Sequence, residues 1–532
     1  MQEMTKAASL TIVLIVLVCG RALAAGPTVW AVPSSLKRVG PRETPGVRTE
    51  VVIRAARGEY ESFQVAIQAP SGGLTNVNFS VSELAGPRDA ILSAANLILY
   101  REWYVTVKHH SPTYNGPPNL PITKVWTFPD ALIPFLDPAT GRPPVEAEFR
   151  AVPFDLVAGR NAVFWVDVFV PRRTVAGPYR GTYTVSSNQG TFEGKIRICV
   201  WSFTLPREPS LKSSFNGGGT TTPAVNQELL RNRLMPDTVN PANERNFINH
   251  FGLNATDLGF FSGVSYGQCN PSKPPSLSEI ESAKALHQPN VYLYDETADP
   301  ESSCTSKEFY RAMVGWAQSL HRAGVDNLVT QEPVPQLYDD GLGTGRSAVD
   351  LWTMLPLAYN DAQSFSPSRV TYVLQKGDKA WSYNALVQDS YSPKWELDFL
   401  PINYRIQAGF ISQSLGLTGL LYWSVDDWST NPWENPQGGQ NPDYPGEGVL
   451  VYPGKPAGLK GVAPSMRLKY LRDGVEDYEY VQLLKNCGQS AFALAEAQKA
   501  GPDWTRWTRD NNVLESVREQ LGNRIASSNC TR

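Results

Sequence analysis

The stretch NVYLYDETADPESSCTSKEFYRAMVGWAQSLHRAGVDNLVT, residues 290–330, decides the fold that the sequence predicts. It begins with an apolar run at residues 291–294 and ends with another at residues 327–330. Between the two runs apolar residues recur at helical spacing, and Gly324 marks the end of this helix. A strand, a helix and a second strand in this order predict two parallel strands joined by a crossover helix.

The same alternation continues along the chain. Residues 226–234 have a helical pattern, and short apolar runs at residues 348–354, 370–374 and 417–425 are interpreted as further strands. A (β/α)8 barrel is the fold that matches strands and helices alternating over about 250 residues. We therefore predict a (β/α)8 TIM-like barrel at residues 210–465.

The N-terminal part has a different pattern. ESFQVAIQ (residues 61–68) alternates between apolar and polar or small residues, and AVFWVDVFVP (residues 162–171) places Phe164, Val166, Val168 and Val170 on one face. Turn signals separate such runs at short intervals. Short strands without helices between them are typical of an antiparallel β-sandwich. We predict this sandwich at residues 28–206, followed by a Pro-rich linker at residues 204–214.

The last segment, residues 466–532, is predicted to be helical. Ser465 is the expected N-cap, and an apolar stripe follows it: Leu468, Leu471, Val475, Tyr478 and Val481. The charged run RDGVEDYEY in this helix is interpreted as structural. The predicted fold class is thus a multidomain β plus α/β protein with a C-terminal helical segment.

The composition and the N-terminal residues indicate which class of protein this is and where it is located. The chain has 532 residues, a net charge of −3, 42% hydrophobic and 19% charged residues, which is typical of a folded protein and not of a nucleic-acid binder. Residues 1–24 resemble a signal peptide with an apolar run too short to span a membrane comfortably. We expect a secreted or periplasmic protein with no membrane span after cleavage; the alternative is that the apolar run remains as an uncleaved anchor.

Neither a cofactor nor a metal is predicted, because none of the 5 His residues has metal-ligand spacing. Five cysteines remain after cleavage, so at least one stays unpaired in a monomer, and Cys269 and Cys304 are a possible pair in an oxidising compartment.

Two carboxylates, Asp295 and Glu296, follow the apolar run of the opening stretch. The C-terminal ends of barrel strands carry the chemistry of this fold, although a bare acid pair also caps helices. Six of the 14 Trp lie within residues 352–433, two of them, Trp428 and Trp433, in a polar loop where they have little reason to be core. Carboxylates near clustered Trp residues indicate a carbohydrate site, because tryptophan faces stack on sugar rings.

The C-terminal half of the barrel resembles a known family. LLYWSVDDWSTNPW (residues 420–433), GEGVLVYPG (residues 446–454) and PSMRLKYLRDGVEDYEYVQLL (residues 464–484) are similar to glycoside hydrolase family 123 and its relatives. YLYDE (residues 292–296) resembles the strand-end Asp-Glu pair of that group, although Thr297 stands where relatives often have Pro.

The resemblance implies a retaining, substrate-assisted glycosidase that acts on a 2-acetamido sugar and is N-acetylgalactosaminidase-like. In that reading Glu296 is the general acid/base, and Asp295 orients and polarises the acetamido group, whose carbonyl attacks the anomeric carbon. The pair is expected to split its pKa values, with a neutral Glu296 beside an ionised Asp295.

Further residues are predicted to bind the sugar. WSYN (residues 381–384) resembles the pocket-lining turn of the family, which implies contacts from Trp381, Tyr383 and Asn384, with core packing as the alternative. Tyr404 is expected to face the pocket together with Arg405, unless the arginine forms a salt bridge. Trp423 and Asp426 complete the predicted site, and a loop cap is the alternative for Asp426.

Two other functions fit the sequence. The first is a two-carboxylate glycosidase in which Glu332 is the nucleophile opposite Glu296, without any need for an acetamido group. The second is a non-catalytic carbohydrate-binding protein on a barrel that has lost its activity. In each case the expected partner is a carbohydrate.

Overall fold

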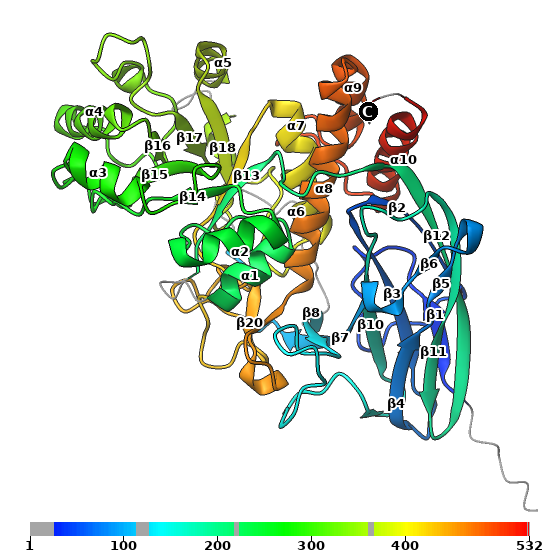
Figure 1. Ribbon diagram of the computed structural model, residues 1–532. Coiled ribbons are helices and arrows are strands. Elements are labelled where there is room, and N and C mark those ends of the chain that lie inside the picture. The colour runs from blue at the N-terminus through cyan, green and yellow to red at the C-terminus, as the bar shows by residue number, and fades with distance from the viewer. Residues whose placement is uncertain (1–25, 113–126, 218–222, 360–366, 529, 531–532) are drawn as a thin grey trace, which may run out of the picture.

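The computed structural model describes residues 26–112, 127–217, 223–359, 367–528 and 530. The predicted signal peptide, residues 1–24, lies outside this part of the chain. Figure 1 shows a barrel and a β-sandwich side by side, with the C-terminal helices between and above them. Within the described residues no helix is long and apolar enough to cross a membrane.

The N-terminal part consists of two β-sheets packed face to face. Every pair of neighbouring strands is antiparallel except β2 and β12, which run parallel. The first sheet has the order β1 (Thr28–Ala31), β3 (Tyr60–Gln68), β10 (Asn161–Phe169), β7 (Leu97–Thr106) and β8 (Thr127–Pro134). The second has the order β2 (Glu50–Arg57), β12 (Gly190–Thr204), β11 (Gly177–Ser187), β4 (Leu74–Val81) and β9 (Phe154–Leu156), with β5 (Leu84–Ala85) and β6 (Ile91–Leu92) beside β11.

Apolar residues at alternate positions of β3 and β10 form the core of this sandwich. Phe63 and Val65 of β3 and Phe164 and Val166 of β10 are buried in one cluster between the sheets. Gln64, on the opposite face of β3, is also buried, but its amide donates to backbone carbonyls such as Ser35 O at 2.6 Å. The predicted β-rich N-terminal part is therefore confirmed.

A parallel seven-stranded sheet forms the barrel. Its order is β13 (Lys212–Phe215), β19 (Gly419–Tyr422), β18 (Lys379–Tyr383), β17 (Leu351–Met354), β16 (Asp326–Val329), β15 (Tyr292–Ala298) and β14 (Ala255–Asp257). The segment Met235–Asp237 lies between the two edge strands: Phe215 N donates to Met235 O at 3.0 Å, and Asp257 N donates to Asp237 O at 2.8 Å. The sheet is thus nearly closed, with a three-residue segment where an eighth strand was expected.

Helices follow most of these strands. They are α1 (Pro223–Arg231), α2 (Pro241–Phe251), α3 (Leu277–Lys284), α4 (Lys307–Arg322), α5 (Pro367–Lys376), and the continuous α6 (Ile402–Ile406), a π-helical turn (Gln407–Ile411) and α7 (Ser412–Leu415). The connection from β16 to β17 contains only the short 3-10 helix Pro335–Leu337, so one crossover departs from the expected pattern.

One predicted strand is wrong. Residues 370–374 lie in helix α5, where Val370 and Val373 are buried while Tyr372 between them is exposed. The apolar residues that matter are three apart, which is helical spacing, and a five-residue run was too short to show this period.

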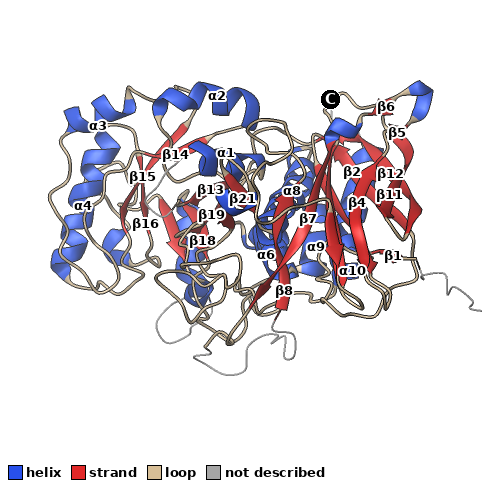
Figure 2. Ribbon diagram, turned by 90° about the horizontal axis from the view of Figure 1, so that it is seen from below, coloured by secondary structure: helices blue, strands red, loops and turns tan. Residues whose placement is uncertain are grey.

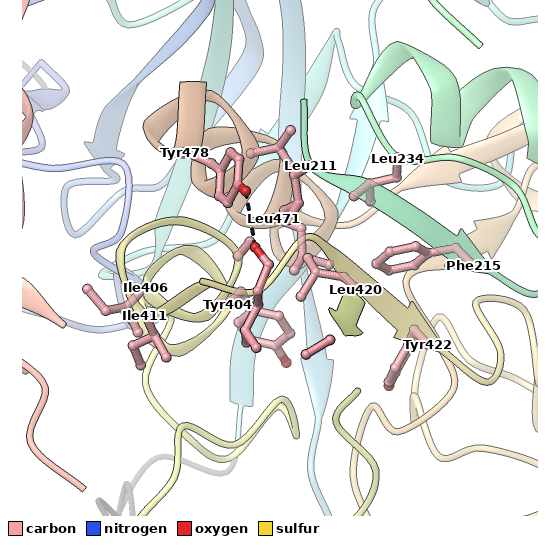
Figure 3. Close-up of a cluster of buried hydrophobic side chains, with 14 of the residues drawn as sticks. Leu211, Phe215, Leu234, Tyr404, Ile406, Ile411, Leu420, Tyr422, Leu471 and Tyr478 are labelled. Atoms are coloured by element: carbon pink, nitrogen blue, oxygen red, sulfur yellow. Dashed lines mark hydrogen bonds between the residues drawn. The ribbon is translucent and has the colours of Figure 1, made fainter. Parts of the chain in front are cut away.

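Helix α8 (Met466–Asn486) packs between the barrel and the sandwich (Figures 1 and 2). Ser465 caps it as predicted, since its Oγ accepts from Leu468 N at 3.1 Å. Figure 3 shows Leu471 and Tyr478 of α8 beside Ile406, Ile411 and Leu420 of the barrel. Helices α9 (Ser490–Ala500) and α10 (Asn511–Ser527) then pack on α8, while the hairpin β20 (Val451–Pro453) and β21 (Val462–Pro464) precedes it.

The charges of α8 are structural, as predicted. Arg472 binds Asp167 of the sandwich at 2.9 Å, and Asp477 binds Arg405 of the barrel at 2.7 Å, all nearly inaccessible to solvent. The helix therefore joins the two parts through buried ion pairs as well as apolar contacts.

Among the described residues two disulfides are formed, Cys269–Cys304 and Cys487–Cys530, and Cys199 is free. The first confirms the pair considered from the sequence.

Candidate active site

The acid pair lies within strand β15 and not after it. Strand β15 extends to Ala298, and Asp295 and Glu296 are paired with Asn327 and Leu328 of β16. Leu328 belongs to the apolar cluster inside the barrel, as does Tyr294. Since successive strand residues point to opposite faces, Glu296 lies on the interior face and Asp295 on the outer one.

Asp295 is fully buried against the loop between β14 and α3. Its Oδ1 accepts from Phe260 N at 2.9 Å, and its Oδ2 accepts from Thr297 Oγ1 at 3.4 Å. Burial raises the pKa of Asp295 to about 7, while hydrogen bonds from Phe260, Thr297 and Asp257 oppose a larger rise. The carboxyl thus titrates near neutrality.

Glu296 is half-buried on the inner side of the barrel. Burial raises the pKa of Glu296 well above its usual value, and the charges of Asp299, Asp237 and Asp295 raise it further. The side chain therefore holds its proton to a higher pH than an exposed glutamate does, which favours the state that a general acid needs.

Two carboxylates that sequence reasoning missed lie beside Glu296. Asp237 belongs to the segment that nearly closes the barrel, and Asp257 ends β14. Oxygens of Asp237, Asp257 and Glu296 lie within 4.8 Å of one another. Asp257 Oδ1 accepts from Gly259 N at 2.9 Å and from Glu296 N at 3.2 Å, and Ser214 Oγ donates to Asp237 at 3.0 Å.

The signal for these two acids was present but weak. Each ends an extended segment at the same edge of the barrel as Asp295, which is the position that identified the acid pair. Their segments are three residues long, too short for a strand pattern to appear in the sequence.

Three clustered oxygen ligands also match the preference of Mg²⁺ or Ca²⁺. Burial raises the pKa of Asp237, and the pKa values of Asp257 and Glu296 are well above their usual range for the same reason. Protonation therefore competes with a cation at this cluster, and the absence of a metal stays a prediction.

The aromatic residues divide into core and mouth. Trp381 is fully buried inside the barrel, edge-on to Tyr294 at 5.5 Å between ring centroids. Trp423 follows Leu421 of the same interior cluster by two residues and is half-buried, so part of its indole remains accessible. Tyr383 is nearly buried, and after burial itself the charges of Glu301, Asp299 and Glu296 raise the pKa of Tyr383. Tyr383 thus lies close to the acids.

Other predicted sugar-binding residues have structural contacts. Asn384 is buried and its amide donates to Pro393 O at 2.7 Å and to Gln407 at 3.1 Å, which fixes the loop after β18. Tyr404 is fully buried in the apolar cluster beside α8 (Figure 3). Its hydroxyl donates to Trp395 O. Arg405 forms the salt bridge that was the alternative to a pocket role.

Asp426 and the loop residue Trp433 have contacts within the fold. Asp426 is nearly buried, and its segment pairs with Val449. Trp433, expected to be exposed, is buried against Phe149 and Tyr452 at the contact of barrel and sandwich. The polar composition of the loop gave no sign of this burial, because the residues that cover Trp433 are distant from it in sequence.

Glu332 is not the carboxylate nearest to Glu296. Burial raises the pKa of Glu332 to about 7, and Arg369 is the charge that opposes this rise. The charges that act on Glu296 come from Asp299, Asp237 and Asp295.

Residues 373–484 match the family described as glycoside hydrolase 123, catalytic domain. This segment runs from α5 into α8 and is less than half of the chain. No curated protein matches the chain.

Among solved structures, a family 123 glycoside hydrolase from Clostridium perfringens, studied for glycolipid glycan hydrolysis, has the same fold. It superposes with a TM-score of 0.63 over 94% of this chain and 97% of that chain, at 14% identity. A β-glucuronidase from Parabacteroides merdae matches with a TM-score of 0.27, 10% identity and coverage of 80% of this chain and 50% of that chain. The family model and the shared fold confirm the predicted resemblance to glycoside hydrolase family 123.

Proposed function

We propose that this protein is a retaining, substrate-assisted glycosidase that cleaves glycosides of a 2-acetamido sugar, with Glu296 as the general acid/base. The observation that carries the proposal is the position of Glu296, an inward-facing carboxyl at the mouth of the barrel whose pKa is raised well above its usual value. A carboxylic acid that keeps its proton at neutral pH can protonate the leaving oxygen.

The steps balance without a protein nucleophile. The acetamido carbonyl oxygen attacks the anomeric carbon, the glycosidic bond breaks, and the leaving oxygen takes the proton of Glu296. The Glu296 carboxylate then takes a proton from water, whose oxygen attacks the anomeric carbon and releases the acetamido group. Two displacements at one carbon retain its configuration.

Asp295 is proposed as the carboxylate that supports the acetamido group. Because it is buried, it acts together with Asp257, with which it is hydrogen-bonded. Two neighbouring carboxyls share a proton when like charges cannot both ionise, so the pair carries about one negative charge near Glu296. That charge stabilises the positive charge that develops on the acetamido group.

Trp423 is proposed as the surface on which the sugar stacks, since its accessible indole belongs to the barrel interior. We also propose that the protein is exported as a secreted or periplasmic enzyme with residues 1–24 as its signal peptide. Two disulfides support an oxidising compartment.

The proposal is tested with matched 4-nitrophenyl glycosides that carry either an acetamido or a hydroxyl group at carbon 2. We expect release of 4-nitrophenol from the acetamido compounds alone, and a product whose first-formed anomer, followed by proton NMR, retains the substrate configuration. Hydrolysis of only the hydroxyl compounds would show that the acetamido group is not the nucleophile.

A second candidate function is a two-carboxylate glycosidase in which Asp237 is the nucleophile. The observation in its favour is the half-buried Asp237, which has an oxygen within 4.8 Å of an oxygen of Glu296. Carboxyl groups about 5 Å apart are typical of retaining enzymes with a protein nucleophile. Azide would then rescue Asp237→Asn by forming a glycosyl azide of inverted configuration, and it would not do so under the substrate-assisted proposal.

A further inference from the structure

Gly446, Glu447 and Gly448 form a turn that places a buried carboxyl against Trp423. Both glycines have left-handed backbone angles, with φ of +83° and +70°. A Cβ on Gly448 would lie 2.8 Å from the Trp423 ring, and a Cβ on Gly446 would lie 2.6 Å from Arg467 Nη1. Only glycine fits at either position, so the turn brings its own backbone into contact with the indole.

Glu447 holds the edge of that indole. It is fully buried, and its Oε1 accepts the Nε1–H of Trp423. Burial raises the pKa of Glu447 to about 7, and hydrogen bonds from Trp423, Leu386 N and the Tyr422 hydroxyl oppose a larger rise. The carboxyl thus joins the loops that follow β18 and β19.

A second buried carboxyl stands beside it. Glu396 is fully buried, and neither of its oxygens has a hydrogen-bond partner among the described residues. Leu397 N donates to Pro445 O at 2.7 Å, which ties the two loops together. Burial and the charge of Glu447 raise the pKa of Glu396 well above its usual value, so Glu396 loses its proton less readily than an exposed glutamate.

The hydrogen bond between Trp423 and Glu447 matters because part of Trp423 remains accessible. Trp423 is half-buried while the residues on either side of it, Tyr422 and Ser424, are buried. A flat ring can support a sugar only if its plane is fixed, because each rotation of the side chain would misplace the ring of the substrate. The indole N–H is the single polar group by which that plane can be fixed.

We propose that Glu447 is a positioning residue of the sugar site, which acts by fixing the plane of Trp423 through the indole N–H. This inference rests on the proposed function, which takes Trp423 as the stacking surface. Glu447 itself does not touch the substrate.

The test is a double-mutant cycle with Trp423→Phe, Glu447→Gln and the double variant, measured as KM and kcat on a 4-nitrophenyl 2-acetamido glycoside. The glutamine amide oxygen can still accept the indole N–H, but it binds it more weakly than a carboxylate does. Glu447→Gln should therefore raise KM about fivefold, with kcat changed less than about twofold. In the Trp423→Phe background, where the N–H is missing, the same substitution should change KM less than about twofold. Equal effects in both backgrounds would overturn the inference.

Glu102→Gln is the matched control, because Glu102 of β7 is also a buried glutamate whose two oxygens have no partner among the described residues. It lies in the sandwich, and we expect its KM to equal that of the wild type. If Glu447→Gln does not fold, the inference is tested with Trp423→Phe alone. This variant must also raise KM, because it lacks the indole N–H. An unchanged KM in Trp423→Phe would overturn the inference.

Binding of free 2-acetamido-2-deoxygalactose, measured by calorimetry on the same variants, separates this inference from the proposed function. In one outcome the protein hydrolyses no glycoside but binds the sugar, and Glu447→Gln weakens this binding only when Trp423 is present. That outcome would contradict the proposed function and support the role of Glu447. A wild-type protein that neither binds the sugar nor hydrolyses a glycoside would overturn both.

Discussion

Adjacent residues with opposite orientations give the two acids different environments. Asp295 receives hydrogen bonds from Phe260 N and Thr297 on the outer side of β15, while Glu296 faces the barrel interior. Burial raises the pKa of both, but these hydrogen bonds hold the pKa of Asp295 at about 7. Neighbours in sequence can therefore differ in charge at one pH, which is what an acid and an anion in one site require.

This difference predicts the pH dependence of kcat/KM. The active form needs an ionised Asp295 and a protonated Glu296. Activity should therefore rise with pH through a limb near 7, the pKa of Asp295, and fall at higher pH as Glu296 loses its proton. Asp295→Asn should lower kcat/KM and abolish the limb near pH 7, and Glu102→Gln should leave the profile unchanged. A limb that persists in Asp295→Asn would assign it to another group.

For single residues, the sequence was enough to select the acid pair but not to predict which of the selected side chains are buried. A strand end and a resemblance were enough to select Asp295 and Glu296. Asn384 was selected by the same resemblance, and Tyr404 as a residue expected to face the pocket. Their partners, Gln407 and Trp395 O, become neighbours only in the folded chain. Asp237 was missed because its neighbours, Ser214 and Asp257, come from other segments.

Among the elements, the loop between β14 and α3 supports the site. It carries Phe260, whose N–H holds Asp295, and the disulfide Cys269–Cys304 ties it to the loop after β15. Backbone bonds add to this tie, since Ser262 N donates to Thr297 O at 2.9 Å and Asp299 N donates to Val264 O at 3.0 Å. The loops on both sides of the acid pair are thus held in one arrangement.

Replacing both cysteines with serine should loosen these loops. Closing a loop between cysteines 35 positions apart restricts the unfolded chain, so the free energy of unfolding should fall by about 2–4 kcal/mol without the disulfide. We also expect a lower kcat/KM at a temperature where the variant is still folded, because Phe260 N no longer holds Asp295 firmly. Replacing Cys487 and Cys530, which join the ends of α8 and α10, should reduce stability without this loss. Equal kcat/KM in both double variants would show that the loops are held by their backbone contacts alone.

Short elements limited the prediction of the barrel. The strand–helix–strand unit around α4 was long enough for its period to be recognised, and the structure has it. The run at residues 370–374 was too short to distinguish a helix from a strand. The segment Met235–Asp237 lies between the two edge strands of the barrel, but its sequence has no strand pattern that would have predicted this position.

The whole molecule is joined by α8. Burial alone would raise the pKa of Asp167, but the charges of Arg472 and Lys469 outweigh it and hold the pKa well below its usual range. Asp167 thus stays ionised in the folded protein and stabilises it above its unfolded pKa; this contribution is lost as the pH falls. The charged sequence of α8 is explained by these contacts, although the sequence could not name the partners.

Arg472→Met should leave Asp167 with one fewer buried partner. Breaking a buried ion pair typically costs about 3–5 kcal/mol, so the free energy of unfolding at pH 7 should fall by that amount in urea denaturation. The loss should shrink at acidic pH, where protonation of Asp167 stabilises the variant more than the wild type. Arg506→Met, which removes an exposed ion pair to Asp503, is the control and should cost about 1 kcal/mol or less. Similar costs for the two variants would contradict a structural role for the buried pair.

Proton donation by Glu296 is the central step of the proposed mechanism, and a comparison of two leaving groups tests it. The wild type and Glu296→Gln are assayed on two aryl 2-acetamido glycosides, one with a phenol leaving group and one with the far more acidic 2,4-dinitrophenol. Loss of general acid catalysis is worth about 10²–10⁴-fold in rate, so kcat/KM should fall by that factor for the phenyl glycoside. For the dinitrophenyl glycoside the loss should be much smaller, because this leaving group departs without a proton. Equal losses on both substrates, or full activity of Glu296→Gln on either, would contradict the assignment of Glu296 as the acid.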